Sequence, residues 1–273
     1  MSVQIRFLGT SAAEGTPAFY CDCPVCVKAA RLGGRNIRTR SQVLVNENLL
    51  MDYPPDTYYH MVSYGLDLKK VEHLLITHSH EDHFIPHDIL MNASPYNAGT
   101  IHHRIQCYGN QKVAGILKRH AGNGDCNMDI HAVAPFEEFQ AGEYKILPLR
   151  ALHDPAEDCL LFGVEGLHGR RFLLGNDTGF FPDDTMERIR GLRFDAIALD
   201  CTLGKDRGGD NHMGFEDILE MRKRLIQNGN AYEHTQWIAQ HFSHNCGAVY
   251  NDAQTLLAPH GFTVAYDGMT VQI

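Results

Sequence analysis

The stretch Thr77-His78-Ser79-His80-Glu81-Asp82-His83 places three imidazoles and two carboxylates within seven residues. It directly follows the apolar run HLLI at residues 73–76, which has the length and composition of a buried strand. A histidine-rich polar turn, a pH-sensing patch and the mouth of a metal site are three interpretations of such a stretch. The rest of the sequence is needed to decide among them.

Bulk composition indicates a globular protein with a sizeable core. The chain has 273 residues, of which 44% are hydrophobic and 21% are charged, so it is long enough for one large domain or two small ones. A formal net charge of −9 repels nucleic-acid phosphates at long range, which argues against a nucleic-acid partner. The four arginines of residues 31–40 carry no interleaved aromatic side chains, and we interpret this run as a solvated loop.

Segments that would direct the chain to a membrane are not evident in the sequence. The longest apolar runs have the length of a strand, so no membrane partner is expected. The N-terminal SVQIRFLG lacks the basic and apolar regions of a signal peptide and is expected to form a strand. We therefore expect a cytoplasmic protein with reduced cysteines, among which a cluster indicates metal binding.

Short β-type segments separated by turns dominate both halves of the chain, and helical patterns fall between them. This arrangement favours an α/β fold in which two sheets pack face to face with helices outside. Strands are predicted at 3–8, 42–45, 49–52, 71–77, 105–108, 144–149, 159–165, 171–176, 194–200, 237–241 and 262–266. Helices are predicted at 56–64, 86–93, 111–120, 184–191 and 215–228.

Three further apolar strands end in a metal-type ligand, as the first one does. His153 follows ILPLRAL, Asp177 follows RFLLGN, and His241 follows WIAQ. Each alone is typical of a surface residue, but the repetition of strand, ligand and turn favours a metal centre. His78 and His80, two residues apart on an extended strand end, point the same way, and Asp82 and His83 can reach a second ion.

The full pattern His78-x-His80-x-Asp82-His83, then His153, Asp177 and His241, resembles the ligand set of the metallo-β-lactamase superfamily. The resemblance implies a four-layer αββα sandwich with a binuclear metal centre. By position, His78, His80 and His153 would hold one ion. Asp82, His83 and His241 would hold the other, and Asp177 would bridge them. One departure is Pro86, which stands where the family usually has a glycine, and it changes the turn into the following helix.

The cysteines of the loop at residues 21–26 form a second candidate metal site. Cys21, Cys23 and Cys26 have a spacing close to that of structural zinc knuckles, although a disulfide with a spare thiol or three buried small side chains would also fit. The cysteine pattern after the loop GTSAAEGTP resembles the PhnP-type phosphodiesterases, the branch related to ribonuclease Z. That resemblance implies His244, in HFSH at 241–244, as the fourth ligand of a structural zinc.

The likeness extends from residue 9 to the end, so residues 1–273 are expected to form a single hydrolase domain. The other five cysteines are expected to be ordinary thiols.

The resemblance implies a phosphoric diester hydrolase in which a hydroxide bridging the two metal ions attacks a small, cyclic or nucleotide-like phosphodiester. The active-site ions would be zinc or manganese, with iron also accepted, and the ligand types alone do not choose among them. His212, in NHMGFED, and Asp82 are the catalytic candidates, with His212 assisting the leaving group. A loop histidine without function is the alternative for His212. Asp52 and Asp200 occupy strand ends and could either support the ligands or cap the strands.

Two other functions are compatible with the same residues. The centre could serve a different substrate, either tRNA 3′ ends or a thioester, and the negative net charge argues against tRNA. The chain could instead be a non-catalytic, zinc-stabilised binding protein, against which the complete set of seven ligand positions argues. A homodimer is common among proteins of the type that the sequence resembles.

Overall fold

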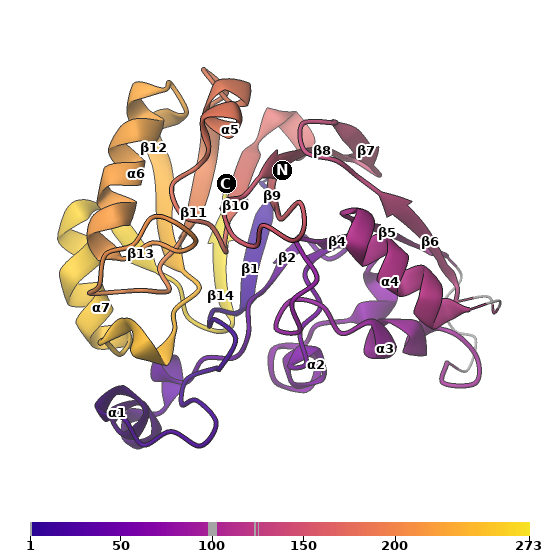
Figure 1. Cartoon of the computed structure of the whole chain (residues 1–273), viewed down its shortest axis with the longest axis horizontal. Helices are drawn as coiled ribbons and strands as arrows, with labels where there is room; N and C mark the ends of the chain where they lie inside the picture. The colour runs from indigo at the N-terminus through magenta and orange to yellow at the C-terminus, as the bar shows by residue number, and fades with distance from the viewer. Residues whose placement is uncertain (1, 98–102, 123, 125) are drawn as a thin grey trace.

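The computed structural model describes residues 2–97, 103–122, 124 and 126–273. Two seven-stranded sheets face each other, and helices cover their outer sides (Figure 1). The predicted α/β sandwich with αββα layers is therefore confirmed.

The first sheet has the strand order β14-β1-β2-β3-β4-β5-β6. The strands are β1 (Gln4–Gly9), β2 (Gln42–Val45), β3 (Leu49–Met51), β4 (His73–Ile76), β5 (Ile105–Gly109), β6 (Met128–Ala132) and β14 (Met269–Gln272). β3 to β6 run parallel, whereas β14, β1, β2 and β3 pair antiparallel. The histidine-rich stretch therefore follows the carboxyl end of β4, which has a parallel neighbour on each side.

The second sheet has the order β13-β12-β11-β10-β9-β8-β7. Its strands are β7 (Phe139–Ala141), β8 (Tyr144–Arg150), β9 (Leu160–Glu165), β10 (Arg171–Gly175), β11 (Phe194–Asp200), β12 (Ala231–Gln240) and β13 (Phe262–Val264). β10 to β13 are parallel, and β7 to β10 are antiparallel. Because β8 and β10 both pair antiparallel with β9, the carboxyl ends of β8, β10, β11 and β12 lie at the same edge.

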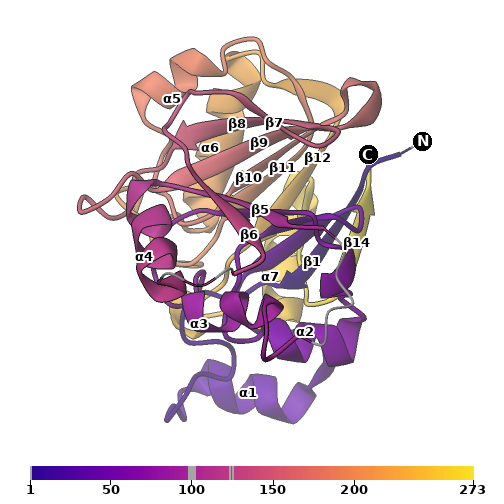
Figure 2. The ribbon, with the colours of Figure 1, turned by 90° about the vertical axis from the view of Figure 1, so that its right-hand side faces the viewer.

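Three apolar clusters define the four layers. Phe7, Phe162 and Phe172 belong to the cluster between the two sheets. Side chains on the outer face of the first sheet pack under the helices that include Ile89 and Leu117, and a third cluster lies over the second sheet. The helices are α1 (Pro24–Leu32), α2 (Thr57–Tyr64), α3 (Pro86–Ile89), α4 (Gln111–Ala121), α5 (Asp183–Arg188), α6 (Phe215–Gln227) and α7 (Tyr250–Leu257), seen from a second direction in Figure 2.

Within the described part of the chain, no helix combines the length and the apolar composition needed to cross a bilayer.

The element predictions fail mainly at the margins of the fold. β6 and β14 are partly exposed outer strands of the first sheet, and neither was predicted because an edge strand does not need a continuous apolar pattern. α1 was also missed, although Cys23 caps it and Pro24 occupies its first turn. The helix predicted at 86–93 is shorter than expected, because α3 ends at Ile89 and a 3₁₀ turn follows.

The cluster between the sheets gives a stability prediction. Phe172 is 1% exposed and packs edge-on against Phe7, with ring centroids 6.2 Å apart. Phe172→Ala should lower the free energy of unfolding by about 3–5 kcal/mol, because it leaves a cavity between the layers. Urea denaturation measures this loss, and Ile226→Ala, at a half-exposed position on α6, should change stability by less than about 0.5 kcal/mol.

Candidate metal centres

The candidate ligands gather where strands from both sheets end. His78 follows β4, His153 follows β8, Asp177 follows β10, and His241 follows β12. Open α/β sheets place ligand sites at the carboxyl ends of their strands, and here two sheets contribute such ends to one edge. The site is therefore assembled from segments that the chain separates by up to 163 positions, from His78 to His241.

Left-handed backbone conformations turn the chain sharply at these strand ends. Asp52, Asp177 and His241 have φ angles of 64°, 47° and 62°. Residues other than glycine adopt this region uncommonly, and aspartate and histidine tolerate it better than β-branched residues do. The sequence thus uses residue types that accept the turn and also carry ligand atoms.

The first ligand group consists of His78, His80 and His153. Their ring centroids lie 4.5 to 5.0 Å apart, and one nitrogen from each lies within 4.8 Å of the others. Nδ1 of His80 is 3.2 Å from Nε2 of His153. The structure thus brings together the three histidines that the sequence pattern assigned to one ion.

The second group consists of Asp82, His83 and His241, and Asp177 lies between the two groups. Nε2 of His83 is 3.2 Å from Oδ2 of Asp82 and 3.3 Å from Nε2 of His241. Oδ2 of Asp177 lies 2.9 Å from the first of these nitrogens and 3.0 Å from the second. Its Oδ1 lies 3.8 Å from Nε2 of His153. Asp177 therefore lies between the two groups, with one carboxylate oxygen toward each of them.

Hydrogen bonds around the two groups fix which nitrogen of each imidazole faces the interior of the cluster. Nδ1 of His78 donates to Thr77, Nδ1 of His83 to Asp52, and Nδ1 of His241 to the hydroxyl of Thr202, at 2.9, 2.7 and 2.9 Å. Their Nε2 atoms therefore face inward and can bind a metal ion once deprotonated. In His80, Nε2 faces Asp154, which leaves Nδ1 for a metal ion. In His153, Nδ1 faces the carbonyl of Asn211, which leaves Nε2 for a metal ion.

This cluster is incomplete without positive charge. Among the described residues, Nε2 of His78 and Oδ2 of Asp177 are buried and have no hydrogen-bond partner. Burial opposes protonation of His83 and His241, yet the carboxylates around them outweigh it. They raise the pKa of His83 well above its usual range and that of His241 to about 10. Divalent cations fit this donor set, since imidazole nitrogens and carboxylate oxygens are ligands of such metal ions.

Asp52 supports the ligands from the first sheet. Its Oδ2 accepts from His83, and its Oδ1 accepts from the backbone N–H of Thr77 at 2.8 Å and from the Thr77 hydroxyl at 2.9 Å. Because the Thr77 hydroxyl in turn accepts from His78, one carboxylate fixes the orientation of two candidate ligands. Of the two roles left open by the sequence, the geometry favours support of the ligands.

Asp200, at the end of β11, plays the corresponding part in the second sheet. Its Oδ2 accepts from Nδ1 of His212 at 2.9 Å and from the backbone N–H of Asp177 at 3.0 Å. Burial alone would raise the pKa of Asp200, but His212 and His241 lower it to about 2. The ring of His212 lies 5.0 Å from that of His153, so the predicted catalytic histidine borders the first ligand group.

The second candidate centre joins the N-terminal loop to the turn after β12. The Sγ atoms of Cys21, Cys23 and Cys26 lie 3.4, 3.6 and 3.5 Å from Nδ1 of His244. A tetrahedral zinc with bonds of about 2.3 Å to sulfur and 2.0 Å to nitrogen sets these atoms about 3.6 Å apart. The distances from the three thiols to His244 therefore fit a Cys₃His zinc site.

Electrostatics at the thiols agree with this geometry. Burial raises the pKa of the Cys26 thiol to about 12. It acts in the same direction on Cys23, but the backbone N–H of Cys26 and the imidazole of His244 lower the pKa of the Cys23 thiol to about 6. One thiolate is thus available near neutral pH to begin metal binding.

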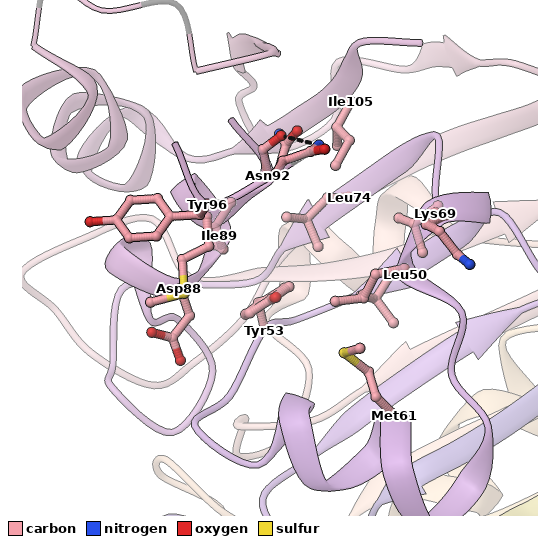
Figure 3. Close-up of a pocket in the computed structure, with 14 residues that line it drawn as sticks. Leu50, Tyr53, Met61, Lys69, Leu74, Asp88, Ile89, Asn92, Tyr96 and Ile105 are labelled. Carbon is pink, nitrogen blue, oxygen red and sulfur yellow. Dashed lines mark hydrogen bonds between the residues drawn. The ribbon is translucent and has the colours of Figure 1, made fainter. Parts of the chain in front are cut away.

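An apolar cavity of about 360 Å³ lies against α2 and α3 (Figure 3). Leu50, Leu74, Met61, Ile89 and Tyr53 are among the residues that line it. None of the candidate metal ligands lines this cavity. Metal chemistry is therefore expected where the strands end, and not in this cavity.

Two acidic residues near the first ligand group were not found from the sequence. Oδ2 of Asp154 lies 3.3 Å from Nε2 of His80, and Glu157 accepts from Ser79 between the two histidines of the motif. Asp154 directly follows His153, which was the available signal, whereas nothing in the sequence relates Glu157 to a residue 78 positions earlier.

Comparison with known proteins places this geometry in a family. Residues 48–234 match the model of the beta-lactamase superfamily domain. The chain therefore belongs to the metallo-β-lactamase superfamily, as its ligand pattern indicated. No curated protein sequence matches the chain.

Solved structures with the same fold include three that cover almost the whole chain. A diphosphatase from the PhnP family is 22% identical, with a TM-score of 0.78 and coverage of 100% of this chain and 98% of that one. Zinc-bound PqqB from Methylobacterium extorquens is 17% identical, with a TM-score of 0.74 and coverage of 99% and 100%. The short form of human tRNase Z is 16% identical, with a TM-score of 0.69 and coverage of 98% of each chain. The family and the hydrolases among these neighbours indicate a metal-dependent hydrolase.

The cysteine site gives a prediction about metal content. Cys23→Ser should remove about one zinc ion per chain and lower the Tm by about 5 °C or more, because structural zinc contributes its binding energy to folding. Metal analysis and thermal denaturation measure the two effects. Cys126→Ser, which alters a thiol outside the site, should leave both nearly unchanged. Equal zinc contents in wild type and Cys23→Ser would contradict the assignment.

Proposed function

We propose that this protein is a binuclear metal-dependent phosphodiesterase that hydrolyses a small phosphodiester. The observation that carries the proposal is the pair of ligand groups that share Asp177, with His212 beside them. The name of the diphosphatase with the same fold supports a phosphorus-containing substrate. We also propose that the centre holds two divalent ions, zinc or manganese.

The residues of the two groups would hold the ions, with the carboxylate of Asp177 available to both groups. When bound, two divalent ions supply hydroxide near neutral pH and withdraw charge from phosphoryl oxygens. Asp82 lies in the second group, where its carboxylate would fix the ion and any water that approaches it. Asp52 and Asp200 keep the imidazoles oriented, so that little rearrangement is needed when substrate binds.

In this proposal His212 protonates the leaving group. Its Nδ1 is engaged by Asp200, which leaves Nε2 for the substrate. The side chain is 17% exposed, and it is positioned at the rim of the ligand groups, where a departing alkoxide could be reached. Burial opposes protonation of His212, but Asp200 raises its pKa above the ordinary value, which favours the proton-donating form.

The surroundings of the centre favour a small substrate over RNA. An open hollow of about 570 Å³ is lined by residues 150–158 and includes His153, and this volume suits a small molecule. Three carboxylates, Asp154, Glu157 and Asp158, line it against one guanidinium, Arg150. Together with the net charge of −9, this lining disfavours a long polyanion such as a tRNA precursor. A thioester substrate would use the same metal ligands and remains the competing hydrolytic reaction.

The substrate class can be tested directly. Protein supplied with Mn²⁺ or Zn²⁺ should hydrolyse bis(p-nitrophenyl) phosphate, and chelation should abolish the turnover, because the ions provide the nucleophile. Release of p-nitrophenolate measures the rate, and His83→Ala serves as a variant with a broken ligand group. Faster hydrolysis of a thioester or cleavage of a tRNA precursor in parallel assays would assign a different substrate. Failure to turn over the phosphodiester, the thioester and the tRNA precursor with any divalent ion would contradict the proposed hydrolase activity.

The role of His212 can be tested with a leaving-group series. His212→Ala should reduce kcat by about a hundredfold or more on alkyl phosphodiesters, because their alkoxide leaves only when protonated. The loss should be much smaller with p-nitrophenyl esters, whose leaving group needs no proton. His234→Ala, at a side chain that is 65% exposed on β12, is the matched control and should retain full activity. Equal losses on both kinds of ester would remove His212 from this role.

A further inference from the structure

Glu157 is a charged side chain that the fold buries beside the first ligand group. Its side chain is 1% exposed, although no residue of the metal-binding motif predicts a carboxylate there. Its two oxygens accept four hydrogen bonds. Oε1 accepts from the Ser79 hydroxyl at 2.6 Å and from Nζ of Lys112 at 3.1 Å. Oε2 accepts from the Ser79 backbone N–H at 3.1 Å and from Nδ2 of Asn110 at 2.7 Å.

These four bonds tie together the segments that carry the first ligand group. Ser79 stands between His78 and His80, so its backbone N–H and hydroxyl set the path of the chain from one ligand to the next. Asn110 caps α4 through Val113, which makes it a fixed point of the first sheet's helical layer. Glu157 itself lies in the loop after β8 that also carries His153.

The neighbouring Asp154 completes the connection. Its Oδ1 accepts from the backbone N–H of Ala156 at 2.8 Å, which keeps the loop compact, and its Oδ2 lies 3.3 Å from Nε2 of His80. This contact selects the tautomer in which Nδ1 of His80 faces His153. The loop after β8 thus supplies the ligand His153 and orients the ligand His80. Through Glu157 it also holds the backbone between His78 and His80.

We propose that Glu157 is a positioning residue that sets the geometry of the metal subsite formed by His78, His80 and His153. It acts through Ser79 and does not touch the metal or the substrate. The inference rests on the proposed function, since it concerns the same centre. A carboxylate is required at this position because a neutral amide has only one oxygen with which to accept. The NH₂ group of a glutamine at position 157 would face a donor from Ser79, Asn110 or Lys112, and two donors cannot hydrogen-bond to each other.

A structural role alone would predict a different pattern of defects. Glu157 bridges residues 78 positions apart, so its loss would also lower global stability to some extent. A residue that only stabilises the fold would lower the Tm without changing the affinity of the folded protein for metal. A positioning residue changes the affinity of the folded protein itself, and partners that orient metal ligands typically contribute about 10- to 100-fold.

The test is a titration of metal-depleted protein with Mn²⁺, followed by calorimetry and by electron paramagnetic resonance. Mn²⁺ prefers imidazole and oxygen ligands to thiolates, so it reports on the histidine and aspartate centre and not on the cysteine site. Glu157→Gln should weaken the affinity of one Mn²⁺ by about 10- to 100-fold and diminish the signal of the coupled ion pair, at a temperature well below its Tm. Glu138→Gln is the matched control, because Glu138 also pairs with two cations, Lys145 and Arg188, away from the ligands. It should bind Mn²⁺ as wild type does.

A second variant keeps the inference testable if Glu157→Gln folds poorly. Ser79→Ala removes only the hydroxyl that donates to Glu157, and it should weaken the same Mn²⁺ by a smaller factor. The double variant should lose less than the product of the two single effects, because both act through one contact. Unchanged Mn²⁺ affinity in Glu157→Gln, or equal losses in Glu157→Gln and Glu138→Gln, would overturn the inference and leave the proposed function intact. Failure of the wild-type protein to bind any Mn²⁺ or Zn²⁺ at this centre would overturn both.

Discussion

The structure depends on the balance of charge around the buried carboxylate of Asp177. One of its oxygens lies about 3 Å from two imidazole nitrogens, and those imidazoles already give their other N–H groups to Asp52 and Thr202. A buried carboxylate that faces lone pairs is destabilised unless a cation lies between them. The surrounding elements hold these ligands close together, and positive charge, on protonated imidazoles or on metal ions, makes the arrangement favourable. The same arrangement explains why the residues around it are oriented so closely by hydrogen bonds.

Each sheet contributes one aspartate to this orientation. Asp52 follows β3 of the first sheet, and Asp200 ends β11 of the second sheet. Each accepts from a histidine Nδ1 and from a backbone N–H of a neighbouring segment, at Thr77 and Asp177 respectively. The two halves of the sandwich thus use the same device on opposite sides of the centre. Because His212 belongs to the set that Asp200 holds, its position relative to the ligands is fixed by the same carboxylate.

The sequence predicted the sandwich and the gathering of its ligands because both are encoded locally. Apolar runs that end in histidine or aspartate mark buried strands whose carboxyl ends meet, and the order of the ligands identifies the family. Whether these residues bind two metals stays a prediction. Strand β6 was missed because a half-exposed edge strand needs no apolar alternation, and α1 was missed because cysteines chosen for their thiols obscure a helix start. Glu157 was missed for a different reason, since its partners become neighbours only after β4 and the loop following β8 are brought side by side.

The cysteine site has a consequence for the connection between the two ends of the polypeptide. Its three thiols lie 223, 221 and 218 positions before the imidazole that completes the site. With zinc bound, the site would act as a clasp that closes most of the chain into a ring. In a chain-entropy treatment, a covalent cross-link over a ring of this size disfavours the unfolded chain by about 5 kcal/mol. The clasp also ends three residues from His241. Opening it would therefore free the N-terminal loop at a point three residues from the candidate ligand His241.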